Sequence, residues 1–157
     1  MLANVAKASL SRLVIGYGND LRSDDGAGIR VATRLAAQLP QSQVIVTHQL
    51  TPDLAEDIAT ATQVIFVDAY VAHGHEAQLR IDKISDDNIF NPAAMGHHGD
   101  PEGLMHLADQ LYGKSPDAWV VGIPAFSFDA GETISPETLH RIDEAVALIG
   151  GRALFEA

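Results

Sequence analysis

The sequence predicts an α/β protein, a three-layer α/β/α sandwich around a mostly parallel, twisted sheet. Short apolar runs typical of buried strands alternate along the chain with segments in which apolar residues recur at helical spacing. Such alternation is typical of parallel strands joined by right-handed crossovers. A length of 157 residues is close to the commonest domain size, and the chain contains no linker or repeat. We therefore expect a single domain over residues 1–157.

The first strand and helix enclose an acidic loop. Leu13–Ile15 is a short apolar run closed by Gly16, which predicts a buried strand. After the loop, apolar residues at helical spacing predict a helix from about Gly26 to Leu39, where Pro40 ends the pattern. Strand, acidic loop and helix form the opening unit.

Two further strands follow in the first half of the chain. Val44–Val46 predicts the second strand, and Thr51 is the expected N-cap of the helix after it. Val64–Val67 is the most apolar run and predicts a third strand that ends at Asp68. The looser alternation from Ala77 to Ile84 predicts an edge strand, so we expect a mixed sheet.

The second half begins with a long loop, from Ser85 to Gly99, which is rich in turn residues. The sequence then predicts a helix opened by Asp100 and Pro101, a last strand, a second loop and a final helix. The last strand is expected at Trp119–Ile123, the second loop at Phe126–Glu132, and the final helix from Ser135 and Pro136 through Ile149.

Composition narrows the class of function. Apolar residues make up 46% and charged residues 20% of the chain, as in ordinary globular proteins. The absence of cysteine excludes disulfides, thiolate metal sites and cysteine nucleophiles. A net charge of −11 disfavours nucleic acid and anionic membrane as partners. With no signal-peptide pattern and no apolar run long enough to cross a bilayer, we expect a cytoplasmic protein.

Polar residues follow the strands where the ligand sites of parallel sheets form. Asp24 and Asp25 follow the first strand, Asp68 ends the third, and His97 and His98 lie in the long loop. Sites in open parallel sheets lie beyond the carboxyl ends of the strands, so these residues can converge. Carboxylate oxygen and imidazole nitrogen suit a divalent transition metal, and three protein ligands leave coordination positions open for a partner.

Each candidate has a structural alternative. Asp24 or Asp25 can instead cap the following helix, and that alternative is the stronger for Asp24. Asp68 directly follows four buried apolar residues, and a partly desolvated carboxylate is costly unless it is paired or ligating, which favours function. Adjacent side chains usually point apart, so we expect only one of His97 and His98 to reach the site. Structural roles are expected for the other histidines considered, which are His73, His75, His106 and His140.

The element Gly16-x-Gly18 also occurs in nucleotide-binding folds, but the context argues against that function. Leu21 occupies the third glycine position, and the second strand ends in Thr47 and His48 without an acid to bind a ribose. The acidic loop would repel phosphate. The chain also lacks the Gly-x-Ser-x-Gly, His-Glu-x-x-His and P-loop motifs, so no covalent nucleophile is expected.

Four motifs together resemble the hydrogenase maturation proteases, which trim the C-terminal tail of the nickel-iron hydrogenase large subunit. They are Gly-x-Gly-Asn-x-Leu-x-x-Asp-Asp-Gly-x-Gly from Gly16 to Gly28, Phe66–Ala69, His-x-x-Asp-Pro from His97 to Pro101, and Leu111–Gly113. The first motif is specific, and the order of the others strengthens it. The resemblance covers most of the chain and implies the same twisted sheet flanked by helices.

The resemblance implies a nickel-dependent, aspartic-type endopeptidase that removes the C-terminal extension of the large-subunit precursor. The positions through which the family contacts metal and acts in catalysis match Asp25, Asp68 and His97, with His98 as an alternative ligand. The nickel would be supplied by the precursor, which is the expected partner. Hydrolysis by a metal-polarised carbonyl, by metal-activated water or with a carboxylate as general base all remain open.

Two other functions remain as alternatives. The lack of a conventional protease motif is compatible with a non-hydrolytic binding or metal-handling module for hydrogenase assembly. A metal hydrolase acting on a small molecule is the other alternative, and it would require a stably bound metal.

Overall fold

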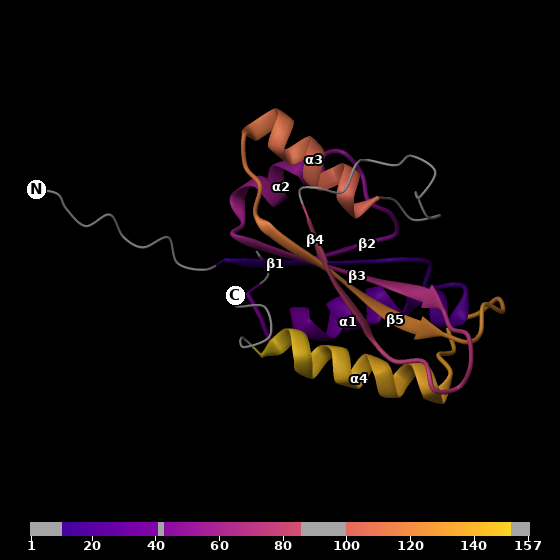
Figure 1. The fold of residues 1–157 in the computed structure, drawn as a ribbon. Helices are drawn as coiled ribbons and strands as arrows, with labels where there is room; N and C mark the ends of the chain where they lie inside the picture. Colours follow the sequence, from indigo (N-terminus) through magenta and orange to yellow (C-terminus); the bar gives the residue numbers. More distant parts are fainter. Residues whose placement is uncertain (1–10, 41–42, 86–99, 152–157) are drawn as a thin grey trace, which may run out of the picture.

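The computed structural model describes residues 11–40, 43–85 and 100–151, which form one five-stranded sheet with helices on both faces (Figure 1). The strands are β1 (Arg12–Tyr17), β2 (Val44–Thr47), β3 (Gln63–Val71), β4 (Arg80–Ile84) and β5 (Asp117–Ala125). The helices are the 3-10 turn η1 (Ser23–Gly26), α1 (Ala27–Ala36), α2 (Leu54–Thr60), α3 (Pro101–Tyr112) and α4 (Pro136–Gly150). The three-layer α/β class predicted from the sequence is confirmed.

The sheet is mixed, as predicted, with the strand order β2-β1-β3-β5-β4. β2, β1, β3 and β5 run parallel, and β4 pairs antiparallel with β5 at the edge. The inner parallel strands β1, β3 and β5 are buried on both faces over most of their length, which is why they read as nearly continuous apolar runs in the sequence.

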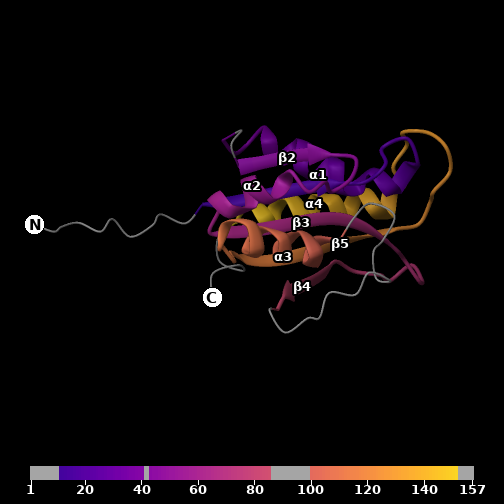
Figure 2. The same cartoon turned by 90° about the horizontal axis from the view of Figure 1, so that it is seen from above.

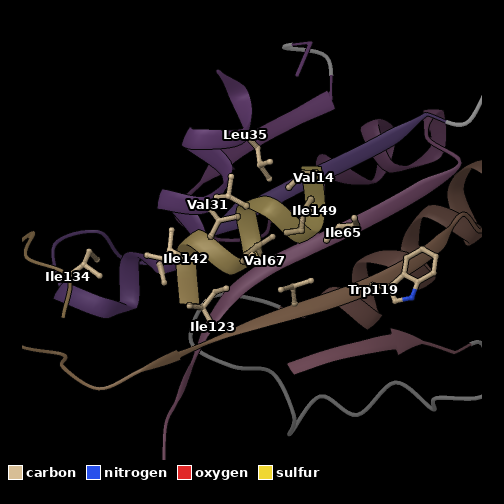
Figure 3. Packing of buried hydrophobic residues seen from close by; sticks show 14 residues of the cluster. Val14, Val31, Leu35, Ile65, Val67, Trp119, Ile123, Ile134, Ile142 and Ile149 are labelled. Carbon is tan, nitrogen blue, oxygen red and sulfur yellow. The ribbon is translucent and has the colours of Figure 1, made fainter. Parts of the chain in front are cut away.

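Two hydrophobic clusters hold the layers together. α1 and α4 pack on one face of the sheet, and α2 and α3 lie on the other (Figures 1 and 2). Under α1 and α4, Val14, Ile65 and Ile123 of the sheet pack in one cluster with Val31 and Ile142 of the helices (Figure 3). The second cluster includes Ile15, Phe66, Ile58, Leu104 and Met105. Each helix buries one side against the sheet, which explains why its apolar residues recur at helical spacing.

Several element boundaries differ from the predicted ones. α1 ends at Ala36, short of Leu39, and its first predicted residue, Gly26, belongs to η1. β4 begins at Arg80 rather than at Ala77. α2 begins at Leu54, so Thr51 is not its N-cap. Instead, the Thr51 carbonyl accepts from the Leu54 N–H (3.1 Å) in a preceding turn.

The other two predicted helix starts are confirmed. The Asp100 side chain caps α3 by accepting from the Glu102 N–H (3.1 Å), and the Ser135 hydroxyl caps α4 by accepting from the Thr138 N–H (3.4 Å). In both helices, proline occupies the first turn, where its missing N–H is not needed.

No helix in the described ranges is long and apolar enough to span a membrane.

Candidate functional site

The predicted carboxylates lie at the edge of the sheet where β1 and β3 end. Asp68 is paired in register with Gly122 of β5. The prediction that β3 ends at Asp68 is wrong. The strand continues to Val71, because its pairing with β5 extends to Ala125. Asp68 therefore stands on a face of the sheet instead of in a loop beyond it.

Asp25 and Asp68 approach each other around Gly18. Asp25 lies in η1, where it is 6% exposed, and its carbonyl accepts from the Asn19 N–H (3.2 Å). Gly18 has φ 145°, and a Cβ placed on it would overlap the Asp25 carbonyl oxygen and lie 3.8 Å from Asp68 Oδ1. The acidic loop thus folds back so that the Asp25 backbone carbonyl and the Asp68 carboxyl both lie next to Gly18, close enough for the charge of Asp25 to act on Asp68.

Burial gives Asp68 an unusual acidity. Desolvation is the largest cause, and together with the nearby charge of Asp25 it raises the pKa of Asp68 to about 7. The Ala69 N–H donates to Asp68 Oδ1 (2.8 Å) and partly offsets the rise. This carboxyl can therefore hold a proton much closer to neutral pH than an ordinary aspartate does.

Tyr17 is a buried neighbour of this carboxyl that the sequence did not single out. It is the last residue of β1, is 2% exposed and lines the same pocket as Asp68. Burial raises the pKa of the Tyr17 hydroxyl well above 10.0, and the charges of Asp68 and Asp100 raise it further. Tyr17 is therefore a neutral hydrogen-bond donor or acceptor at physiological pH.

Asp24 has a structural role different from the predicted helix cap. Its carboxylate forms no cap bond to η1 or α1 and accepts instead from the backbone of the loop between β5 and α4. The donors are the N–H groups of Phe126 (2.8 Å), Ser127 (3.0 Å) and Ser135 (2.7 Å) and the Ser135 hydroxyl (2.7 Å). Asp24 thereby fastens that loop and the start of α4 to η1.

These hydrogen bonds also determine the charge of Asp24. Burial alone would raise the pKa of Asp24, but the bonds from Ser135, Phe126 and Ser127 outweigh burial and hold the pKa below 3.8. Asp24 is thus a permanently charged, fully engaged carboxylate.

The glycines of the first motif allow close packing of protein backbone. A Cβ on Gly28 would lie 2.6 Å from the Tyr17 carbonyl oxygen and would overlap that of Val67, while one on Gly16 would overlap the backbone of Gly28. α1 therefore packs directly on β1 and β3 at this point.

A pocket of about 330 Å³ opens beside Asp68, between the start of α3 and the strands β3, β5 and β4. Its lining carries four carboxyl side chains and one guanidinium, those of Asp68, Asp82, Asp100, Glu102 and Arg80. Its aromatic and small lining residues include Tyr17, Tyr70 and Gly122. The charged groups that line the pocket are thus mostly acidic.

The third predicted ligand lies outside the described residues. His97 and its alternative His98 both fall between 85 and 100, so the structure does not test them. Within residues 11–40, 43–85 and 100–151, no group of three or more histidine or acidic side chains is arranged to hold a metal ion. Asp25 and Asp68 are the members of the predicted set that the structure brings together.

Sequence reasoning missed Tyr70, Arg80 and Gly122 as parts of this pocket. A signal existed for Tyr70, because residues two apart in a strand share a face and Tyr70 follows Asp68 by two. Nothing in the sequence showed the pairing of β4 with β5 that brings Arg80 across from Asp68.

The fold is shared with structures of proteins that process hydrogenases. One is the [NiFe] hydrogenase maturation protease HycI from Thermococcus kodakarensis KOD1, which is 24% identical, with 90% of this chain and 92% of that chain covered and a TM-score of 0.67. The hydrogenase maturating endopeptidase HybD from E. coli is 22% identical, with 89% and 90% covered and a TM-score of 0.62.

A third similar structure is the hydrogenase 2 maturation peptidase from Thaumarchaeota archaeon SCGC_AB-539-E09. It is 27% identical, with 87% of this chain and 93% of that chain covered and a TM-score of 0.58. The sequence matches no protein-family model and no curated protein. The chain therefore has the fold of the hydrogenase maturation proteases over about nine-tenths of its length.

Proposed function

We propose that this protein is an endopeptidase that removes the C-terminal extension of a nickel-loaded nickel-iron hydrogenase large-subunit precursor. The observation that carries the proposal is the meeting of Asp25 and Asp68 around Gly18, in a fold shared with known maturation proteases. Those similar proteins are proteases of hydrogenase maturation, and they suggest the reaction class. We also propose that the protein is cytoplasmic and acts on the precursor there.

The nickel of the precursor would be recognised by Asp25, Asp68 and His97. Asp68 is a partly desolvated carboxyl with a pKa of about 7, beside a second acid, so a cation that replaces its proton is favoured there. Asp24 is not available for this role, because four protein donors already surround its carboxylate.

Chain connectivity is compatible with His97 as the third ligand. Asp100 lines the Asp68 pocket, and His97 precedes it by three residues. Three residues span at most about 11 Å, so the imidazole has the reach to meet nickel held at Asp68. His98 is the alternative ligand.

This arrangement would make cleavage depend on correct assembly. Asp25, Asp68 and His97 leave coordination positions open, as a site that reads metal on another protein requires. Binding through the nickel would place the nearby peptide beside the two carboxylates, and a precursor without nickel would lack that anchor. The proteolytic step would then follow metal insertion.

Variants of the three residues test the proposal when they are co-expressed with the precursor. Asp25→Asn, Asp68→Asn and His97→Ala are each expected to leave the precursor uncut, because each removes one ligand while keeping most of the shape. The matched controls are Asp20→Asn in the same loop and the exposed His106→Ala in α3, which should process it fully. Intact mass of the precursor is the readout.

The same assay separates the proposal from the binding alternative. Complete processing by all three variants would contradict the assigned site. Failure of the wild-type protein to release a C-terminal peptide from a precursor that it binds would favour a non-hydrolytic module.

A further inference from the structure

A row of three residues crosses the sheet beside the proposed site. Asp68 of β3 is paired with Gly122 of β5, and Gly122 is paired in turn with Arg80 of β4. Paired residues present their side chains on the same face, and neighbouring strands lie about 4.8 Å apart. Asp68 and Arg80 therefore flank a position that carries no side chain, and the pocket of about 330 Å³ lies over it.

Tyr70 occupies the space that Gly122 leaves. A Cβ on Gly122 would lie 2.9 Å from Tyr70 Cδ1 and 3.5 Å from Arg80 Cβ, so only glycine leaves room for the ring here. The Tyr70 hydroxyl donates to the Gln78 carbonyl, and the Arg80 guanidinium carbon lies 3.9 Å from the centre of the ring. The cation is thus held over an aromatic ring whose own position is fixed.

The N–H groups of the Arg80 guanidinium are available to a ligand. Across the part of the chain that the structure describes, its side chain donates no hydrogen bond and forms no ion pair, and its one specific contact is with the Tyr70 ring. A guanidinium carries five N–H donors and no acceptor, so it is suited to a ligand oxygen.

The charge of the pocket indicates which kind of ligand oxygen Arg80 would bind. Asp68, Asp82, Asp100 and Glu102 line the same pocket, so an anionic ligand group would meet more negative than positive charge. A peptide carbonyl oxygen is a neutral acceptor and avoids this repulsion.

We infer that Arg80, supported by Tyr70 across Gly122, binds a backbone carbonyl oxygen of the substrate peptide beside Asp68. The inference rests on the proposed function and assigns to it a subsite that holds the substrate chain. Arg80 contributes to substrate binding, and Tyr70 is its positioning residue.

The chain contains a matched control on the same strand. Lys83 of β4 also lies over an aromatic residue of β5, with Nζ 5.3 Å from the centre of the Trp119 ring and 3.8 Å from Asp117. Because Lys83 is three residues from Arg80, it projects from the opposite face of the sheet. Lys83→Ala therefore removes the same charge and the same kind of contact away from the pocket.

The experiment measures cleavage kinetics on a nickel-loaded large-subunit precursor. Arg80→Ala is expected to raise KM about tenfold with kcat within about twofold, since a charge-assisted hydrogen bond to the substrate is lost. Arg80→Lys should recover part of the loss, and Tyr70→Leu should raise KM while Tyr70→Phe, which keeps the ring, should not. Lys83→Ala should match the wild type.

Binding of the precursor to the Asp25→Asn protein gives a second readout that does not need turnover. Adding Arg80→Ala should raise the Kd about tenfold, with unchanged circular dichroism. Wild-type KM and Kd in the Arg80→Ala proteins, while the wild-type enzyme cleaves, would overturn the subsite alone. Absence of both cleavage and binding by the wild-type protein would overturn the proposed function and the subsite with it.

Discussion

Asp24 and Asp25 are adjacent acids that their surroundings separate into different roles. Asp24 accepts four hydrogen bonds from the loop between β5 and α4, and these keep its pKa low. Asp25 lies near Asp68 at Gly18, and the negative charge of Asp25 helps to raise the pKa of Asp68. One carboxylate thus fastens the fold, and its neighbour is the one that we propose contacts the nickel.

Asp68→Asn gives a pH-dependent stability test of this residue. In the wild type, the pKa of Asp68 is about 7 when folded and near 3.8 when exposed, so the native state binds more protons between these values. Wild-type stability should therefore fall as pH rises through that window and level off above pH 7. The variant lacks this titration. Its free energy of unfolding relative to that of the wild type should therefore increase by roughly 1–2 kcal/mol between pH 5 and pH 8.

Urea unfolding at several pH values measures that difference. The matched variant is Asp82→Asn, whose side chain is exposed on β4, and it should show a flat difference from the wild type. A difference for Asp68→Asn that is likewise flat from pH 5 to pH 8 would contradict the burial argument.

At the scale of elements, the strands and helices were predictable because their apolar periods reflect burial in two layers. The capped starts of α3 and α4 could also be read directly, from Asp100-Pro101 and Ser135-Pro136. The role of Asp24 could not, because its donors lie more than 100 residues away in the sequence and local patterns record only local bonds. The same limit concealed the row formed by Asp68, Gly122 and Arg80.

Two glycine substitutions test whether close contact between α1 and the sheet explains the first motif. Gly28→Ala should lower the unfolding free energy by about 2 kcal/mol or more, since its Cβ would meet the carbonyls of Tyr17 and Val67. Gly150→Ala, in α4, makes the same gain in helix propensity, but its Cβ meets nothing closer than 3.7 Å. Urea unfolding should show the first variant destabilised and the second unchanged or up to about 1 kcal/mol more stable. Equal stabilities would contradict the packing argument.

At the scale of the whole molecule, the topology explains why distant acids share one edge. β1 and β3 are parallel neighbours, and Gly16 of β1 is paired with Val67 of β3, so Asp68 lies level with the end of β1, where the loop that carries Asp25 begins. The start of α3 adds its N-cap Asp100 and Glu102 to the lining of the pocket. The sequence predicted this convergence for Asp25 and Asp68, and His97 stays a prediction.

The most direct test of the central claim is the nickel dependence of cleavage by the wild-type protein. A large-subunit precursor is prepared with and without nickel, and its intact mass is followed after mixing with the purified chain. Because Asp25, Asp68 and His97 are proposed to bind through nickel carried by the substrate, the loaded precursor should lose its C-terminal extension and the nickel-free one should stay whole. Equal cleavage of both precursors, or of neither, would contradict this account.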